Sequence, residues 1–302
     1  MWKPPQNVMF PWLASISRNL QGVHLPQFSS KEIWIFTDYV FENRQFDYDV
    51  LSILLFDPDT SRGWSDSIQH LRTTSDFSNR RMSYKTLKDG VRQKAFHSFM
   101  SAANELDGLI FSLAVHKSLK HPIITPDMVG KYQSLLSLKA NWTFKVLERM
   151  LIISKVTAFL ISGLSHFGQN VMWISDQDDI FANSDFSNDT CTFFTKFLHI
   201  FSSHSYGTIS IGTTQLTEPD LIEEDLAAIS DICAGGTGEL LTLIRKEYGC
   251  IPGIAFELKS KLPPKPTNFF NWYTSPSEKL RKHVCVLDRQ GKELRTIYWR
   301  GK

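Results

Sequence analysis

The chain has 302 residues, 42% of them hydrophobic, so it can bury a large core and is too apolar for a disordered protein. Its 33 Lys and Arg against 31 Asp and Glu leave a formal charge of only +2, which argues against a uniformly basic nucleic-acid binder; any basic surface must be local. The four cysteines form no CxxC pair, which argues against a zinc ribbon and gives no indication of a disulfide framework.

The cellular location is predicted from two segments. Pro4 and Pro5 stand where a signal peptide would need an apolar helix. The longest apolar stretch, residues 150–164, is interrupted by Lys155 and is shorter than the roughly 20 residues that a bilayer requires. We therefore expect a core helix there and a cytoplasmic protein that is neither secreted nor membrane-spanning.

The first half of the chain predicts a hairpin, a loop, a helix and a strand. Residues 32–38 and 49–57 are β-branched and aromatic runs joined by a short polar link. Residues 57–80 are polar and predict mostly loop, with a short helix around 64–72. Helical spacing of apolar residues predicts a helix over 84–106, and residues 109–115 predict a central strand, apolar on both faces.

The second half alternates helices with strands. Residues 129–168 predict two helices or one bent helix, and residues 170–175 predict a strand that runs into a group of aspartates. A short strand is expected at 208–212. A helix is expected at 223–243, where the glycines of AGGTG indicate close helix packing rather than a phosphate loop.

The C-terminal part predicts a separate extension. Three prolines in LPPKP, residues 262–266, indicate a boundary, and residues 283–288 and 293–299 predict a hairpin. We therefore divide the chain into a domain of residues 1–260 and a basic extension of residues 261–302. The basic run from Lys279 onward is compatible with a solvated edge, with contact to nucleic acid, or with contact to a second copy or another protein.

The resulting order of strands and helices predicts an α/β fold: a mixed sheet flanked by helices, with a small C-terminal β-hairpin extension.

Acidic residues stand where this fold would place a site. Asp38 ends the first strand, and Asp176, Asp178 and Asp179 follow a later one. Three acids in four residues repel one another unless a cation or basic groups neutralise them.

Two further acids lie on the last long predicted helix. Asp231 and Glu224 are seven residues apart, close to two helical turns, so both are expected on one face. Each acid alone is also explained by a cap, a turn or an ion pair. Together, oxygen ligands without a His or Cys set favour Mg²⁺ or Mn²⁺.

The order of these motifs resembles an RNase H-like fold. It consists of a strand ending in Asp38, a hairpin, a helix entered through RRMSYKTLKD, a strand ending in HK, a strand ending in WISDQDD and an acidic helix with SDICAG. More narrowly, residues 33–243 resemble the uncharacterised bacterial family known as domain of unknown function 3800. Asp38, Asp176 and Asp231 match its first, middle and last acids, and Lys117 matches a basic residue after its third strand.

The resemblance implies a nuclease that hydrolyses phosphodiester bonds of RNA or DNA with Mg²⁺ or Mn²⁺. Asp38 and Asp231 would ligate metal, Asp176 would hold its other side, and Lys117 would offset charge on the phosphate. The alternative explanation, a plain surface lysine, is favoured for Lys117. Tyr39 stands where that family has Glu, so Glu42, Glu224 or Asp178 would replace that ligand, or the site would hold one metal.

Two other functions stay open. WISDQDDIF also resembles the metal-binding acidic stretch of family-2 glycosyltransferases, although the nucleotide-binding strand that begins those enzymes has no counterpart here. The missing Glu instead favours a non-catalytic RNase H-like binding module. Ser165 lacks the GxSxG spacing of a nucleophile elbow, and Ser203 and His204, as sequence neighbours, are poorly placed for a triad.

Overall fold

The computed structural model describes residues 2, 5, 11–119, 123–214, 221–253, 260–291 and 293–300. The chain forms two compact units. The first contains Met1–Ile33 and His121–Glu218, and the second contains Trp34–Lys120 and Pro219–Lys302. The predicted boundary at residues 262–266 lies inside the second unit.

The second unit is built on a mixed sheet. Its strands are β1 (Glu32–Val40), β2 (Tyr48–Phe56), β3 (Gly108–His116), β6 (Leu280–Gln290) and β7 (Glu293–Arg300). They lie in the order β1-β2-β3-β6-β7, where β3 and β6 are parallel and the other neighbours are antiparallel. Every residue of β2 is buried, as expected of an interior strand.

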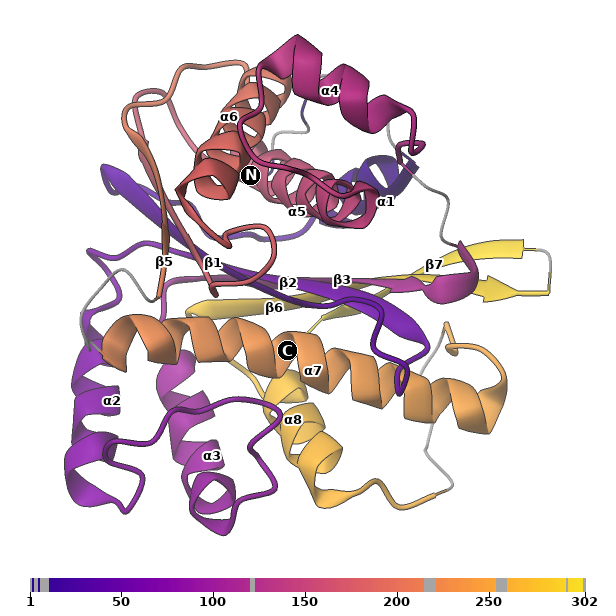
Figure 1. The fold of residues 1–302 in the computed structure, drawn as a ribbon. Coiled ribbons are helices and arrows are strands. Elements are labelled where there is room, and N and C mark those ends of the chain that lie inside the picture. The colour runs from indigo at the N-terminus through magenta and orange to yellow at the C-terminus, as the bar shows by residue number, and fades with distance from the viewer. Residues whose placement is uncertain are drawn as a thin grey trace. The chain divides into compact units, whose positions relative to one another are not determined.

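The helices of the second unit lie together on one side of this sheet (Figure 1). They are α2 (Arg62–Thr74), α3 (Gly90–Ala103), α7 (Leu221–Tyr248) and α8 (Pro264–Thr274), and a short 3₁₀ helix, η1 (Lys117–Leu119), follows β3. α7 packs across β2 and β3, and α8 packs on α7 and α3. α7 is also long and apolar enough to cross a membrane, but it is mostly buried, as expected of a core helix.

Glycines allow α7 to approach its neighbours closely, as the AGGTG motif predicts. A Cβ atom on Gly235 would lie 2.3 Å from the Tyr84 ring, and one on Gly236 would lie 2.5 Å from the Phe269 ring. At Gly238 the same atom would lie 2.7 Å from the Phe46 ring. A side chain at any of these three positions would therefore force its neighbour to move.

The first unit pairs two strands with a group of helices. Its elements are α1 (Pro11–Leu20), α4 (Met128–Leu136), α5 (Phe144–Leu164), β4 (Asn170–Ser175), α6 (Ser184–Phe201) and β5 (Ile209–Thr213). β4 and β5 are parallel, α6 packs on both β5 and α5, and α5 buries the apolar stretch expected to be a core helix. Trp173 of β4 is fully buried against the rings of Phe181 and Phe194.

The predicted α/β fold with a mixed sheet is confirmed, while several predicted helices are wrong in extent. The helix expected over 84–106 begins only at Gly90, because the Asp89 side chain accepts the N–H groups of Val91 and Arg92 and caps it there. The short helix predicted around 64–72 is confirmed as the 13-residue α2, which extends two residues further at each end. Residues 129–168 form two helices, and α1 and α6 have no predicted counterpart.

The predicted C-terminal hairpin is confirmed, and a helix begins within the proline stretch. Pro264 begins helix α8 at its first position, where the missing N–H of proline costs no hydrogen bond. β6 pairs in parallel with β3 from Gly108 and Leu280 onward, so the hairpin is part of the sheet of the second unit. Lys282, in the basic run, is buried and not on a solvated edge. Lys292 and Lys302 of that run lie outside the described residues.

Candidate functional site

Asp38 lies near the end of β1, at one end of a polar row. It pairs in register with Ser52 of β2, which pairs with Ser112 of β3. Both serines are fully buried, and their hydroxyl oxygens are 2.6 Å apart. The half-buried Asp38 carboxylate accepts the Tyr39 N–H at 2.7 Å. Because directly paired residues share a face of the sheet, Asp38 extends this row of polar side chains from β3 and β2 onto β1.

Asp231 lies on the part of α7 that contacts β1. The Ser230 hydroxyl donates a hydrogen bond to the Phe36 carbonyl at 3.0 Å, and both residues are fully buried. The Asp231 carboxylate accepts the Tyr84 N–H at 2.5 Å. The helical turn that carries Asp231 is therefore fixed on β1 two residues before Asp38.

Glu224 and Asp225 are held by arginines at the start of α7. Arg81 Nε lies 2.5 Å from Glu224 Oε2, and Arg72 binds both oxygens of Asp225 at 2.5 and 2.7 Å. Asp225 is buried, so its charge requires this bidentate partner. Glu224, predicted as a metal ligand, forms an ion pair that fixes the first turn of α7.

The aspartates after β4 belong to the first unit, and each makes local contacts. Asp176 is exposed, and its Oδ1 accepts the Gln177 N–H at 3.1 Å and the Thr214 hydroxyl at 3.3 Å. Asp178 accepts the Ile180 N–H at 2.9 Å. Asp179 pairs with Arg149 at 3.0 Å. The N–H contacts of Asp176 and Asp178 are those of turn residues, whereas Asp179 is held by its ion pair with Arg149.

Lys117, predicted to face a phosphate, contacts main-chain oxygens in this structure. Its ammonium group donates to the carbonyls of Asn43 and Phe46, in the link between β1 and β2. Its own N–H donates to the Asp47 carbonyl at 3.0 Å. Lys117 thus holds the 43–47 loop in place, an arrangement that its position after a strand does not reveal.

Asp38 and Asp231 of the second unit carry the type of oxygen ligand that divalent cations such as Mg²⁺ bind. Within the ranges that the structure describes, no three His, Cys, Asp or Glu side chains gather closely enough to form a metal cage. Mg²⁺, however, is commonly bound by one or two carboxylates, with water and substrate phosphates as its other ligands. Asp38 and Asp231 meet that requirement in donor type, whereas Glu224 is already neutralised by Arg81.

The first unit contains a serine–histidine contact that no sequence motif predicts. Ser165 Oγ lies 3.1 Å from His204 Nε2 and 3.1 Å from the Tyr206 hydroxyl. The Ser165 hydroxyl also donates to the Ile161 carbonyl at 2.8 Å, at the C-terminal end of α5. That bond commits its proton to the helix end, so the contact has the character of a cap rather than of an activated nucleophile.

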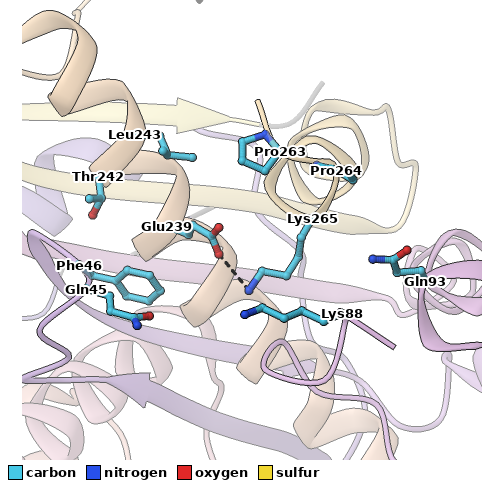
Figure 2. Close-up of a pocket in the computed structure, with 10 residues that line it drawn as sticks. All are labelled: Gln45, Phe46, Lys88, Gln93, Glu239, Thr242, Leu243, Pro263, Pro264 and Lys265. Atoms are coloured by element: carbon cyan, nitrogen blue, oxygen red, sulfur yellow. Dashed lines mark ion pairs between the residues drawn. The ribbon is translucent and has the colours of Figure 1, made fainter. Parts of the chain in front are cut away.

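A pocket of about 460 Å³ opens in the second unit, and its lining comes from four separate segments. Figure 2 shows Phe46 and Gln45 of the 43–47 loop together with Glu239 of α7. The ammonium ends of Lys88 and Lys265 point in from the other side. No sequence motif marks these residues, because they are distant in the chain and meet only in the folded protein.

Lys265 and Glu239, which line the pocket, form a network of contacts with Tyr84 beside it. Lys265 Nζ lies 2.9 Å from Glu239 Oε2 and 3.7 Å from the centre of the Tyr84 ring. The Tyr84 hydroxyl donates to the same Glu239 oxygen at 2.8 Å. Burial raises the pKa of Tyr84, and the Glu239 charge raises it further, so this hydroxyl remains a donor at neutral pH.

Comparisons with known proteins find a distant structural likeness and no match to a family or a curated protein. No protein-family profile matches the chain, and no curated protein matches it. Among solved structures, the ribonuclease H2 of Pyrococcus horikoshii OT3 matches with 12% sequence identity and a TM-score of 0.37, over 72% of this chain and 77% of that chain. So distant a likeness carries no argument about activity. Membership of the domain of unknown function 3800 family stays a prediction from motifs.

Proposed function

We propose that the protein is a cytoplasmic, divalent-metal-dependent nuclease with an RNase H-like fold. The supporting observation is the hydrogen bond from Ser230 to the Phe36 carbonyl, which seats the turn that carries Asp231 on the strand that carries Asp38. With α7 seated there, Asp38 on the strand and Asp231 on the helix would supply two oxygen donors to one cation. Such a pair suits Mg²⁺ or Mn²⁺ that shares its remaining ligands with water and a substrate phosphate.

The chain's own groups would orient this pair. The Tyr84 N–H holds Asp231, and the Tyr39 N–H holds Asp38, as hydrogen-bond donors commonly do for metal-ligating carboxylates. A bound cation would supply an activated water and polarise the phosphoryl oxygen. The expectation that Asp176 and Asp178 complete the ligand set stays a prediction from the sequence.

A second candidate is a non-catalytic nucleic-acid-binding module. It is favoured by the observation that two predicted site residues have structural partners, Glu224 in its ion pair with Arg81 and Lys117 at two main-chain carbonyls. In this alternative the protein would bind nucleic acid without metal and leave it intact.

Cleavage assays separate these functions. Labelled single-stranded RNA, single-stranded DNA and an RNA–DNA hybrid are incubated with the protein in Mn²⁺ or in chelator. We expect cleavage that chelator abolishes and that Asp38→Asn and Asp231→Asn each reduce by about 100-fold, the scale of losing an electrostatic group at a reacting centre. Asp66→Asn, an exposed aspartate of α2, is the matched control and should cleave as the wild type does.

The other outcomes are equally informative. Metal-independent binding without cleavage would establish the binding module. Transfer from a nucleotide sugar, measured with the same variants, would establish the glycosyltransferase alternative. Cleavage that persists in both aspartate variants would place the active site elsewhere.

A further inference from the structure

We infer that the pocket of the second unit binds the phosphate and base of a nucleotide, either free or within a strand. The pocket is lined from the 43–47 loop, the approach to α3, α7 and the start of α8. The choice of a nucleic-acid ligand rests on the proposed function. The lining residues indicate an anionic and aromatic ligand, because they include two lysines and a phenylalanine.

The lining favours an anion. Lys88 and Lys265 bring two positive charges against the single negative charge of Glu239, so the described lining carries a net charge of +1. The N-terminal turn of α8, which borders the pocket, holds no acidic residue and no side-chain cap. A helix N-terminus attracts negative charge. Pro264 and Pro266 lack N–H groups, so the first turn of α8 offers few backbone donors and recognition relies mainly on the two ammonium groups.

One of the two lysines is positioned in advance. Glu239 holds the Lys265 ammonium at 2.9 Å, and the Tyr84 hydroxyl in turn holds Glu239. Lys265 is largely buried, and it also lies over the Tyr84 ring. Lys88 is exposed at the pocket mouth. The pocket thus has a fixed inner cation and an outer one that can close on a phosphate.

The opposite wall suits a base. The Phe46 ring contacts α7 at Gly238, where a Cβ atom would clash with it, so the ring stands close against the helix. Its loop is fixed by Lys117, which binds the Asn43 and Phe46 carbonyls, and by Thr242, which accepts the Asp47 N–H at 2.9 Å. Aromatic rings held in this way stack on bases of any sequence.

The amide side chains and the size of the pocket agree with that ligand. Gln45 and Gln93 line the pocket, and each amide carries both a donor and an acceptor for the edge of a base. The volume of about 460 Å³ is within the range of small-molecule and cofactor sites.

Calorimetric titrations in chelator test the inference without any cleavage. The probes are inorganic phosphate, adenosine, AMP and a short oligo(dT) strand, added to the full-length protein. We expect AMP or the strand to bind, and Lys88→Gln to weaken that binding about tenfold, the scale of losing one charged hydrogen bond. Lys94→Gln removes an equal charge from the exposed face of α3 outside the pocket and should leave binding unchanged.

A second variant tests the base. Phe46→Leu should weaken AMP or the strand and leave inorganic phosphate unaffected, and a melting curve shows whether that variant folds. If AMP binds, a free nucleotide is enough to occupy the pocket. If only the strand binds, the ligand is a nucleotide within a polymer. No binding of any phosphate probe, or equal loss in Lys88→Gln and Lys94→Gln, would overturn the inference.

The same titration on Asp38→Asn keeps the two proposals apart. That variant should bind AMP or the strand as the wild type does, because Asp38 is not part of the pocket lining. If the wild type binds AMP or the strand but cleaves no nucleic acid, only the nuclease proposal is refuted. Cleavage with unchanged binding in Lys88→Gln refutes only the pocket.

Discussion

The Ser230 hydroxyl donates a hydrogen bond to the Phe36 carbonyl at 3.0 Å, and this bond fixes the longitudinal position of α7 on β1. It is a long-range, fully buried contact between residues almost 200 positions apart in the chain. Backbone carbonyls of a strand normally bond to a neighbouring strand, so a helix hydroxyl at this position marks a specific docking point.

Replacing Ser230 tests that docking point. Ser230→Ala should reduce the free energy of unfolding by about 1 kcal/mol, the net value of one buried hydrogen bond. It should also weaken Mn²⁺ binding, because the turn that carries Asp231 loses its contact with β1. Ser162→Ala removes a comparable bond within α5, to the Phe159 carbonyl, and should cost similar stability without changing Mn²⁺ binding. Equal Mn²⁺ affinity in both variants would contradict the assigned role of Ser230.

A buried ion pair joins the end of α7 to β6. Asp288 is fully buried, and its carboxylate accepts hydrogen bonds from Arg245, from the Tyr48 hydroxyl at 2.9 Å and from the Ile251 N–H at 2.8 Å. Asp288→Ala should cost about 3–5 kcal/mol in urea unfolding, because it leaves a largely buried arginine uncompensated. The exposed pair of Arg80 and Asp89 supplies the control: Arg80→Ala should cost far less stability than Asp288→Ala.

Lys282 should make stability depend on alkaline pH. Burial lowers the pKa of Lys282 to about 8 from the ordinary 10.5, while its ammonium donates to the carbonyls of Trp272 and Ser275 at the end of α8. Between these two pH values the unfolded chain binds a proton that the folded protein has lost, so this residue's contribution to stability rises with pH. Unfolding at several pH values from 7.5 to 10 should show the wild type gaining stability relative to Lys282→Met. A constant difference would show that the folded-state pKa is not lowered.

The close approach of α7 and α8 predicts a contrast between two glycines. Gly236→Ala should destabilise the protein by about 1–3 kcal/mol, because the added methyl group would lie 2.5 Å from the Phe269 ring. Gly130→Ala, in α4, has open space around the added atom and should stabilise the protein by up to about 1 kcal/mol. Thermal melts of both variants measure the contrast, and similar shifts in the two would contradict the tight packing of α7.

The sequence predicts strands more successfully than helices here, for physical reasons. Four of the strands, β1 to β4, are short β-branched or apolar runs bounded by polar residues. Such a pattern is typical of a buried strand. α6 begins with a run of Ser, Asp, Asn and Thr, which are poor helix formers. The Asn183 cap and the buried aromatic residues of its second half offset that beginning.

The site is less predictable because its contacts are long-range. Asp38 and Asp231 can be proposed as metal ligands from their positions on a strand and a helix. Nothing in the sequence indicates that Lys117 binds carbonyls more than 70 residues away, or that Arg81 neutralises Glu224. The pocket has no motif at all, since Phe46, Lys88 and Lys265 meet only through the packing of α7 and α8.

The measurement that tests the central claim most directly is a calorimetric titration of Mn²⁺ into the wild type, Asp38→Asn, Asp231→Asn and the control Asp66→Asn. Asparagine retains an acceptor oxygen for the N–H groups of Tyr39 and Tyr84, so each variant should fold while losing a charged ligand. We predict saturable binding by the wild type and the control, weakened about 10- to 100-fold or lost in the two site variants. Identical Mn²⁺ binding in all four proteins, or none in the wild type, would contradict a metal site at Asp38 and Asp231.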